Sequence, residues 1–331
     1  MSRVDVIVPC YNYGNMLRAC VRSVLDQEDA DVRVIVMDDA STDSTEAVGR
    51  RLAAEDPRVE YRRHETNCGH IATYNEALAD VTADYCMILS ADDLLTAGAL
   101  SRATRTMDAH PRVGLAYGRD ITFRHTPPRE MTHGGRHCPH HIIGYAEFLE
   151  QSCRLGHTSI QAPTAIVRTT LHRHIGGYLP ELPHSGDTEI WLRMAAHADV
   201  CALDAVQAFR RLHAINMSLG YSPVRRLAAQ KRAFDIHFDA YRGVRREIAA
   251  LEPVLNRTIA ESAFWGGARA FDDGDSTACD EFLALASAAW PQIESWAPWR
   301  RLRWKRRLGR AVYRWIEPIA NTAGFAIKSR A

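Results

Sequence analysis

Two adjacent carboxylates, Asp92 and Asp93, directly follow an apolar run at residues 85–89. The run is typical of a buried strand, and ligands of an open α/β sheet lie outside the carboxyl ends of its strands. Carboxylate oxygens are hard ligands that suit Mg²⁺ or Mn²⁺, ions that proteins commonly share with substrate phosphates. The pair therefore indicates a metal-assisted enzyme acting on a nucleotide-linked substrate. The alternative is a solvated acidic turn after a strand.

Polar residues also follow two earlier predicted strands. Tyr11 and Asn12 come after the first strand, and Asp38 and Asp39 come after the second. Three such endings at one edge of a sheet favour a binding site. Neither G-x-G-x-x-G nor G-x-x-x-x-G-K-[ST] is present, so a glycine-rich loop would not cradle phosphates here. A divalent cation near Asp92 and Asp93 is the natural substitute for that neutralising role.

Strands and helices alternate from the N-terminus, which predicts an α/β fold with a doubly wound, mostly parallel, Rossmann-like sheet. Asp43 with Glu46 is a capping-box pattern for the second helix, and Thr96 is the predicted N-cap of the fourth. Long helical patterns replace this alternation near residue 223. We therefore expect a nucleotide-binding catalytic domain over residues 1–220 and a helical C-terminal region over residues 221–331. The predicted strands are 4–9, 32–37, 59–62, 85–89, 113–117, 120–124, 164–168, 200–203 and 206–211, and the main predicted helices are 16–25, 43–55, 71–79, 96–107, 224–241, 253–271 and 276–289.

Composition excludes several classes of protein. The formal net charge is +1 at pH 7, so no overall field favours nucleic acid, and we expect no nucleic-acid partner. The eight cysteines include no C-x-x-C pair, which argues against a zinc module or a redox motif. No secretory signal and no apolar stretch of about 20 residues are visible in the sequence. We expect a reduced, cytoplasmic protein.

Two further polar positions could do chemistry. Asp187 begins an amphipathic helix after a loop rich in glycine and proline. It is placed either as an N-cap or, across a cleft from a metal, as a general base. His213 follows the last predicted strand and is either a third metal ligand or an ordinary loop residue. The histidine-rich segment 125–142 fits no standard zinc spacing, and we expect a mobile loop there.

The C-terminal part turns basic from Trp299, with arginines and lysines interleaved with tryptophan at helical spacing. Such a pattern suits a peripheral contact with an anionic membrane. The alternatives are a packed helix with a solvated cationic face and, behind both, a nucleic-acid contact.

Taken in order, these motifs resemble the inverting glycosyltransferases of family 2, which have the GT-A fold. The resemblance covers about residues 3–218 and leaves the C-terminal third outside it. It implies a nucleoside-diphosphate sugar as donor, Mn²⁺ or Mg²⁺ as cofactor and a glycan or lipid-linked acceptor. The matching stretches are 6–12, 36–43, 67–69 with Asn75, 89–93, 176–178, 186–187 with 191–193, and 211–213.

The resemblance also implies roles for individual residues. Asp187 matches the catalytic base, Asp92 matches the last acid of the metal motif, and His213 matches a histidine that completes the metal site in some members. Asp93 is a further candidate ligand. Ser90 stands where the family has the first acid of the motif, and it brings no charge. The donor-binding positions would be Pro9, Tyr11, Asn12, Asp39, Asn67, Ser90 and Ala91.

Two other classes of protein share this general architecture. A nucleotide-sugar pyrophosphorylase would carry a glycine-rich, basic loop after the first strand, where this chain has Pro9, Tyr11 and Asn12. A non-catalytic nucleotide-sugar-binding protein could have lost the metal acid at Ser90. The expected reaction is transfer from a UDP-sugar with inversion, in which Asp187 deprotonates the acceptor hydroxyl.

Overall fold

The computed structural model describes residues 2–128, 138–214, 216, 220–310 and 312. The chain divides into two compact units, each taken here by itself. The first comprises Met1–Leu149 and Thr158–Asn216, and the second comprises Glu150–His157 and Met217–Ala331. All the candidate site residues belong to the first unit.

The first unit is built on one mixed sheet whose strands run in the order β3-β2-β1-β4-β8-β6-β9-β5, with β7 paired to β9. β1, β2, β3 and β4 are mutually parallel, as the alternating sequence predicts. β6 is parallel to β9, whereas β8, β5 and β7 pair antiparallel with their neighbours. The strands are β1 (Arg3–Cys10), β2 (Asp31–Asp38), β3 (Val59–Arg63), β4 (Tyr85–Ile88), β5 (Leu94–Leu95), β6 (Val113–Phe123), β7 (His140–Ile143), β8 (Ile166–Arg168) and β9 (Asp199–Arg211).

The strand order changes direction between β1 and β4. From β1 the chain steps outward to β2 and β3, and then crosses back to add β4 on the other side of β1. A crevice opens outside the carboxyl ends of the strands at such a switch point. The residues that follow β1 and β4 are therefore the ones that the fold places at a ligand site.

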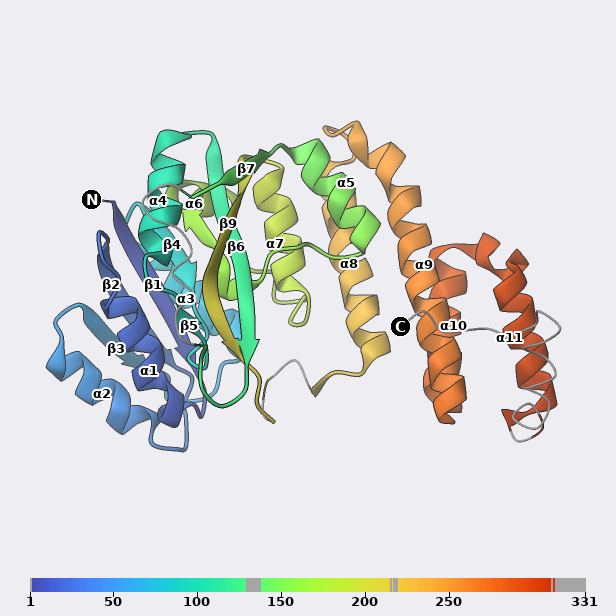
Figure 1. Ribbon diagram of the computed structural model, residues 1–331, viewed down its shortest axis with the longest axis horizontal. Helices are drawn as coiled ribbons and strands as arrows, with labels where there is room; N and C mark the ends of the chain where they lie inside the picture. The colour runs from blue at the N-terminus through green and yellow to red at the C-terminus, as the bar shows by residue number, and fades with distance from the viewer. Residues whose placement is uncertain (1, 129–137, 215, 217–219, 311, 313–331) are drawn as a thin grey trace. The chain divides into compact units, whose positions relative to one another are not determined.

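Helices cover both faces of the sheet (Figure 1). Side chains along β1 alternate between the two faces of the sheet. On one face, Val4, Val6 and Val8 join a core cluster with the apolar sides of α1, α2 and α4. The helices α3, α6 and α7 supply the packing around Cys86 and Ile88 of β4. The helices of this unit are α1 (Gly14–Leu25), α2 (Thr45–Glu55), α3 (His70–Ala79), α4 (Ala99–Ala109), α6 (Thr169–Ile175) and α7 (Gly186–Ala195).

Several predicted boundaries were wrong. Thr96 is not the N-cap of α4, which begins after Gly98, because Thr96 donates its hydroxyl to the carbonyl of Val206 beside the β5–β9 pairing. Asp43 does not cap α2 either, since the N-cap position is Ser44. The strands predicted at 113–117 and 120–124 are one strand, β6, whose pairing with β9 contains register shifts. Such irregularities are β-bulges, and they interrupt the sequence pattern without ending the strand.

The histidine-rich segment lies partly outside the described residues, which omit 129–137 and with them His133 and His137. The end of that segment is β7, and not a loop. His140 and His141 have different partners, the first lying 3.3 Å from Nε2 of His110 and the second 3.1 Å from Glu147. The described histidines therefore do not converge on one zinc ion. The helix α5 (Tyr145–Leu155), which the sequence did not predict, follows β7.

The second unit is helical, as predicted. It contains α8 (Pro223–Tyr241), α9 (Glu247–Asp273), α10 (Ser276–Ala289) and α11 (Ala297–Leu308), with α9 and α10 side by side (Figure 1). The apolar side of α11 packs inside this unit, because Leu302 is buried and Trp299 packs on Phe264 with 5.9 Å between the ring centroids. The tryptophan stripe is therefore mainly a packing feature. Trp304 is exposed, and Trp315 lies outside the described residues.

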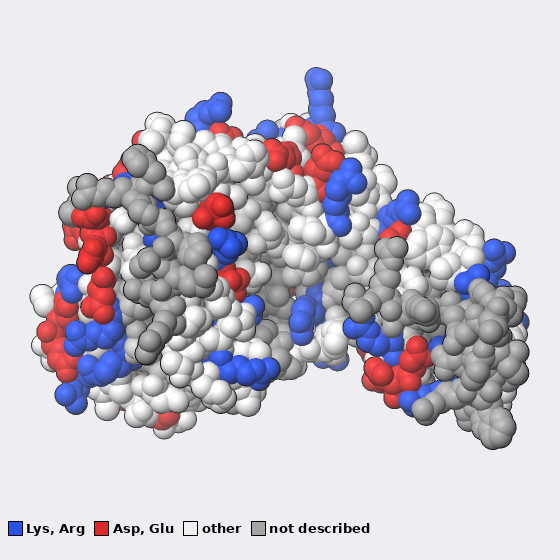
Figure 2. Space-filling model, viewed as in Figure 1, with Lys and Arg blue, Asp and Glu red and all other residues white. Residues whose placement is uncertain are grey.

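The surface carries charges of both signs. Over α2 and β3, Figure 2 shows blue and red side chains mixed. The ion pairs of these elements include Arg51–Glu55 and Arg62–Glu60. Exposed pairs of this kind contribute little to stability, about 0–1 kcal/mol each. Within the described part of the chain, no helix is both long enough and apolar enough to cross a membrane.

Candidate active site

The loops that follow β1 and β2 are bound to each other. Asn12 has φ +59° and uses its backbone N–H to bond Ser41 Oγ at 2.9 Å. Its side-chain oxygen accepts from the N–H of Thr42 at 2.8 Å. Asp43 accepts from the N–H of Gly14 at 3.0 Å, and a Cβ on that glycine would lie 2.6 Å from Ser44 Oγ. The bonds fix one rigid rim at the crevice, and Tyr11 projects from it with 48% exposure.

Asp38 and Asp39 are adjacent in the sequence but bind different parts of the protein. Asp38 is fully buried and accepts from Tyr61 and Arg63, which together with the N–H of Ser41 hold its pKa low against the effect of burial. It is thus a structural group.

Asp39 organises the loop before α3. Its Oδ1 accepts from the N–H of Cys68 at 2.7 Å and lies 2.8 Å from Nδ1 of His64, and its Oδ2 accepts from the N–H of Gly69 at 2.9 Å. Asn67 donates to the backbone carbonyl of Asp39 at 3.1 Å. Asp39 and Asn67 therefore shape the predicted donor pocket, and any contact that they make with a donor stays a prediction.

The fold brings together Asp92 and His213, which are 121 residues apart in the sequence. Oδ2 of Asp92 lies 2.9 Å from Nε2 of His213 and accepts from Nδ2 of Asn216 at 3.1 Å. Asn216 also accepts from the backbone N–H of His213 at 2.6 Å, which fixes the turn. The edge of the Tyr13 ring packs on His213, with 5.5 Å between the ring centroids. This is a compact polar cluster at the end of β4.

The side chain of Asp93 has different partners from that of Asp92. It is 5% exposed and its Oδ1 accepts from the backbone N–H of Arg211 at 2.8 Å. Burial, followed by the charge of Asp92, raises the pKa of Asp93. Among the described residues, Asp92, Asp93 and His213 do not bring three ligand atoms within 4.8 Å of one another. The structure thus brings Asp92 and His213 into contact, whereas the side chain of Asp93 is buried and bonds the backbone of Arg211.

The two predicted donor contacts before Asp92 also differ. Ala91 is fully buried in the core cluster, and Ser90 is half-buried, with its backbone carbonyl accepting from the N–H of Asp93 at 2.9 Å. Pro9 is half-buried at the end of β1. Ser90 and Pro9 therefore keep part of their surface exposed, whereas Ala91 has none and is a packing residue.

Asp187 is in the first turn of α7, and the N-cap position is Ser185. Part of Asp187 is exposed, yet the protein atoms around its carboxyl group displace water and raise its pKa. A hydrogen bond from the buried Tyr178 side chain and the nearby His70 oppose that rise. A raised pKa and a preserved opening to solvent are what a general base needs.

The loop before Asp187 is fastened to α3. Asn75 donates to the carbonyl of Tyr178 at 2.8 Å and accepts from its N–H at 2.8 Å. His70 Nε2 lies 2.8 Å from the carbonyl of Pro183. Arg193, which pairs with Glu189, donates to the carbonyl of Gly177 at 2.7 Å. These bonds explain the glycine, asparagine and arginine of the matched motifs as supports for the loop of Asp187.

Gly177 packs closely against the side chain of Asn75. A Cβ there would lie 2.3 Å from Oδ1 of Asn75, so Gly177→Ala should displace the amide and break its bonds to Tyr178. We expect a loss of about 1–3 kcal/mol of unfolding free energy, measured by urea denaturation. Gly144→Ala is the matched control, because a Cβ there meets nothing within 4 Å. Equal stability of the two variants would show that the Asn75 contact is dispensable.

Tyr74 packs against Tyr178 and His70, the two residues that act on the candidate base. Burial raises the pKa of its hydroxyl, and the charges of Asp187 and Asp92 raise it further. Its ring packs edge-on against Tyr178, with 5.5 Å between the centroids. Tyr74 therefore contacts Tyr178, the hydrogen-bond partner of the candidate base.

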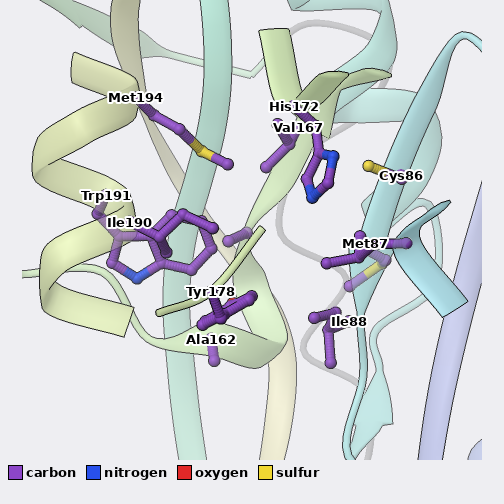
Figure 3. A pocket seen from close by; sticks show the side chains of 12 residues that line it. Cys86, Met87, Ile88, Ala162, Val167, His172, Tyr178, Ile190, Trp191 and Met194 are labelled. Carbon is purple, nitrogen blue, oxygen red and sulfur yellow. The ribbon is translucent and has the colours of Figure 1, made fainter. Parts of the chain in front are cut away.

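A small cavity lies behind the site, between β4, α6 and α7 (Figure 3). Its volume is about 20 Å³, and its lining is largely apolar, with Met87, Ile88 and Met194 beside Tyr178. One water molecule needs about 10–15 Å³ of such space, so no sugar fits. The cavity therefore belongs to the packing that supports Tyr178.

The Asp92 cluster fits a divalent cation. It offers a carboxylate oxygen and an imidazole nitrogen 2.9 Å apart, a pairing of ligand types that Mn²⁺ accepts. Nδ1 of His213 is buried and has no hydrogen-bond partner among the described residues. Asp92 and His213 would hold the ion, and Ser90 adds no charge to it.

Sequence reasoning missed Tyr13, His70 and Asn216. Asn216 follows His213 by three residues, a turn spacing that could have indicated its contact with the histidine. Tyr13 and His70 had no such local signal, because their partners lie far away in the sequence.

Comparison with known proteins identifies the motifs. Residues 5–176 match the model of glycosyl transferase family 2. An uncharacterised protein of Mycobacterium tuberculosis is 26% identical over 225 residues, 63% of this chain and 66% of that protein. The GalNAc(5)-diNAcBac-PP-undecaprenol beta-1,3-glucosyltransferase of Campylobacter jejuni is 32% identical over 102 residues, 30% of this chain and 33% of that protein. The matched region thus spans from about a third to just under two thirds of these relatives.

Two solved structures share the fold. S. aureus TarS 1–349 in complex with UDP-GlcNAc has a TM-score of 0.66 at 17% identity, covering 97% of this chain and 92% of that one. The mannosyltransferase PcManGT from Pyrobaculum calidifontis, in complex with GDP-Man and Mn²⁺, has a TM-score of 0.52 at 18% identity, covering 97% and 87%. These likenesses support the GT-A architecture and its helical C-terminal part.

Proposed function

Because the chain belongs to glycosyl transferase family 2 and is a glycosyltransferase, we propose that it moves a sugar from a nucleoside-diphosphate donor to an acceptor hydroxyl with inversion. The donor is a UDP-sugar, and the acceptor is a glycan or a lipid-linked saccharide. The observation that carries the proposal is the strand order at the β1–β4 switch point, where the Asp92–His213 cluster follows β4, together with the loop of Asp187 that is fastened to α3.

Donor binding has a physical basis in the rim of the crevice. The exposed ring of Tyr11 offers a stacking surface for a nucleobase, at the end of the rigid loop that Asn12 fixes. Pro9 and Ser90 border the same crevice. Asp39 keeps part of Oδ2 available for a base or ribose, since that oxygen accepts one described hydrogen bond.

Asp187 acts as the general base. Its carboxylate takes the proton from the acceptor hydroxyl as the oxygen attacks the anomeric carbon from the side opposite the diphosphate, which inverts the configuration. The bond between the anomeric carbon and the diphosphate oxygen breaks in the same step. Tyr178 orients the base through its hydrogen bond, and the fastened loop holds both residues in place.

The cofactor is Mn²⁺ or Mg²⁺, held by Asp92 and His213. When bound, such an ion supplies charge neutralisation for the leaving diphosphate. The residues Asp92, His213 and Asn216 orient one another, so the ligands are prepared before the ion binds. Asp93 supports this end by fixing the backbone of Arg211.

A donor panel tests the proposal. Thermal-shift titration with nucleoside diphosphates and their sugars, with Mn²⁺ present, should show one preferred donor, since binding adds RT ln(1 + [L]/Kd) to stability. Release of free nucleoside diphosphate in the presence of a saccharide acceptor should follow. A preferred donor that is bound but transferred to no acceptor would favour a non-catalytic binding protein.

We further propose that α11 makes a contact with the inner face of the cell membrane. The exposed side of α11 carries Arg300, Arg303 and Arg307 around Trp304. Among the described residues, no acidic side chain pairs with these three arginines. A cationic face with one tryptophan is suited to anionic headgroups, each arginine contributing about 1 kcal/mol.

Vesicle sedimentation tests this contact. Changing Arg300, Arg303 and Arg307 together to glutamine should weaken binding to phosphatidylglycerol vesicles by roughly 100-fold at low salt. Equal binding of the variant and the unmodified protein would remove α11 from the membrane contact. The control carries the same charge change at three exposed arginines elsewhere: Arg50, Arg51 and Arg154.

A further inference from the structure

A second cluster of metal-ligating groups lies at the other end of the crevice. One ligand atom each from Asp39, His64 and Cys68 lies within 4.8 Å of the other two. Asp39 directly follows β2, and His64 and Cys68 both lie in the loop between β3 and α3, so the pairing of β2 with β3 brings the two loops together. The set combines an oxygen, a nitrogen and a sulfur ligand.

The histidine has the second partner that metal-bound imidazoles usually have. Nδ1 of His64 faces Oδ1 of Asp39 at 2.8 Å, while Nε2 faces Oε2 of Glu76 at 3.1 Å. A ligating histidine typically donates its other N–H to a carboxylate, which fixes the ring and raises its basicity. Glu76 fills that position from α3, and the ring is only 10% exposed.

The thiol is accessible. Cys68 is the only cysteine classed as exposed among the eight; Cys138 is intermediate and the other six are buried. Its Sγ now donates to the carbonyl of Thr66 at 3.3 Å, an exposed contact that rotation of the side chain can break. Metal–ligand bonds of about 2.0–2.3 Å place tetrahedral ligands roughly 3.3–3.7 Å apart, so no pair of the three atoms needs to close by more than about 1.5 Å. Oδ1 of Asp39 and Nδ1 of His64, which are 2.8 Å apart, would instead move slightly apart.

We propose that Asp39, His64 and Cys68 form a binding site for Zn²⁺, distinct from the Asp92 cluster. A thiolate with an imidazole and a carboxylate selects Zn²⁺ or Co²⁺, whereas Asp92 and His213 lack a soft ligand. Binding releases the Nδ1 proton of His64 and the thiol proton of Cys68 to solvent. The fourth position stays open to water.

The site has a consequence for the donor, and this part rests on the proposed function. Asp39 cannot accept a hydrogen bond from a nucleobase as strongly when it also binds a zinc ion. The ion withdraws electron density from the carboxylate and draws the 67–69 loop inward. Zn²⁺ should therefore weaken donor binding at this site.

Cobalt spectroscopy tests the site directly. Titrating the reduced, full-length protein with Co²⁺ should produce one thiolate-to-cobalt charge-transfer band that saturates at one ion per chain and is displaced by Zn²⁺. Cys68→Ser and His64→Gln should each abolish or greatly weaken the band. Cys138→Ser, at the half-exposed cysteine, should keep it. Absence of the band in the unmodified protein, or its persistence in Cys68→Ser, would overturn the proposal.

A second titration separates the two claims. Zn²⁺ should weaken UDP binding at least tenfold in the unmodified protein and leave it unchanged in Cys68→Ser. If the cobalt band is present and Zn²⁺ does not affect UDP affinity, the metal site stands and its link to the donor pocket is refuted. If the unmodified protein binds no nucleoside diphosphate at all, the proposed function is what has failed.

Discussion

Replacing Asp187 with asparagine is expected to lower glycosyl transfer by about 10²–10⁴-fold, the usual contribution of a general base. The amide keeps the size of the side chain and can still accept the bond from Tyr178, but it cannot take a proton. Donor affinity should be unchanged, because the base contacts the acceptor. The measurement is nucleoside-diphosphate release with acceptor present, together with donor titration by thermal shift.

Glu181→Gln is the control for this variant, since Glu181 is an exposed acid in the same loop. It should transfer at the rate of the unmodified protein. Full activity of Asp187→Asn would remove Asp187 from the mechanism.

The pH profile should reflect the environment of Asp187. Desolvation raises the pKa of this carboxyl above the ordinary value for aspartate. The base works only when ionised, so activity should fall as pH falls through that raised pKa. Tyr178 stabilises the ionised form, and Tyr178→Phe should therefore move the acid limb to higher pH. An unmoved limb would mean that another group titrates.

Replacing Asp92 with asparagine is the second change with a large expected effect, a loss of about 10²–10³ in turnover. The substitution removes the only charge that the Asp92–His213 pair would offer to a cation, so Mn²⁺ should no longer raise activity or stability. The readouts are turnover as a function of Mn²⁺ concentration and the Mn²⁺-dependent shift in melting temperature with UDP present.

The control for Asp92 is Asp204→Asn, an exposed acid on β9 whose side chain is 69% exposed. It should keep both the activity and the Mn²⁺ dependence. If Asp92→Asn keeps an unaltered Mn²⁺ dependence, the ion is held by other groups.

The sequence predicted the layout of the first unit well. Apolar runs of strand length and helical periodicity alternate from the first residues, and such local patterns depend only on neighbours along the chain. The motifs, in their order, led to the correct family and fold. Asp92, His213 and Asp187 were predicted as site residues, and the structure brings the first two into contact.

The errors came from contacts over long distances in the sequence. Thr96 has the chemistry of an N-cap, yet the carbonyl of Val206 takes its hydroxyl. In α11, tertiary contacts bury Leu302 and bring Trp299 against the core of the second unit, and the membrane contact predicted for its basic face stays a prediction. Local propensity is overridden where tertiary packing offers a better partner.

What the sequence by itself determined is therefore the order of elements, the family and the set of polar residues at the strand ends. Only the tertiary structure decided what each of these residues faces. Asp92 and Asp93 are adjacent in the chain, but one meets His213 across 121 residues and the other meets the backbone of Arg211. The register of β5 on β9 sets both contacts, and register depends on the whole sheet. The same reason hid the Asp39–His64–Cys68 cluster, in which Asp39 follows β2 whereas His64 and Cys68 lie in the loop between β3 and α3.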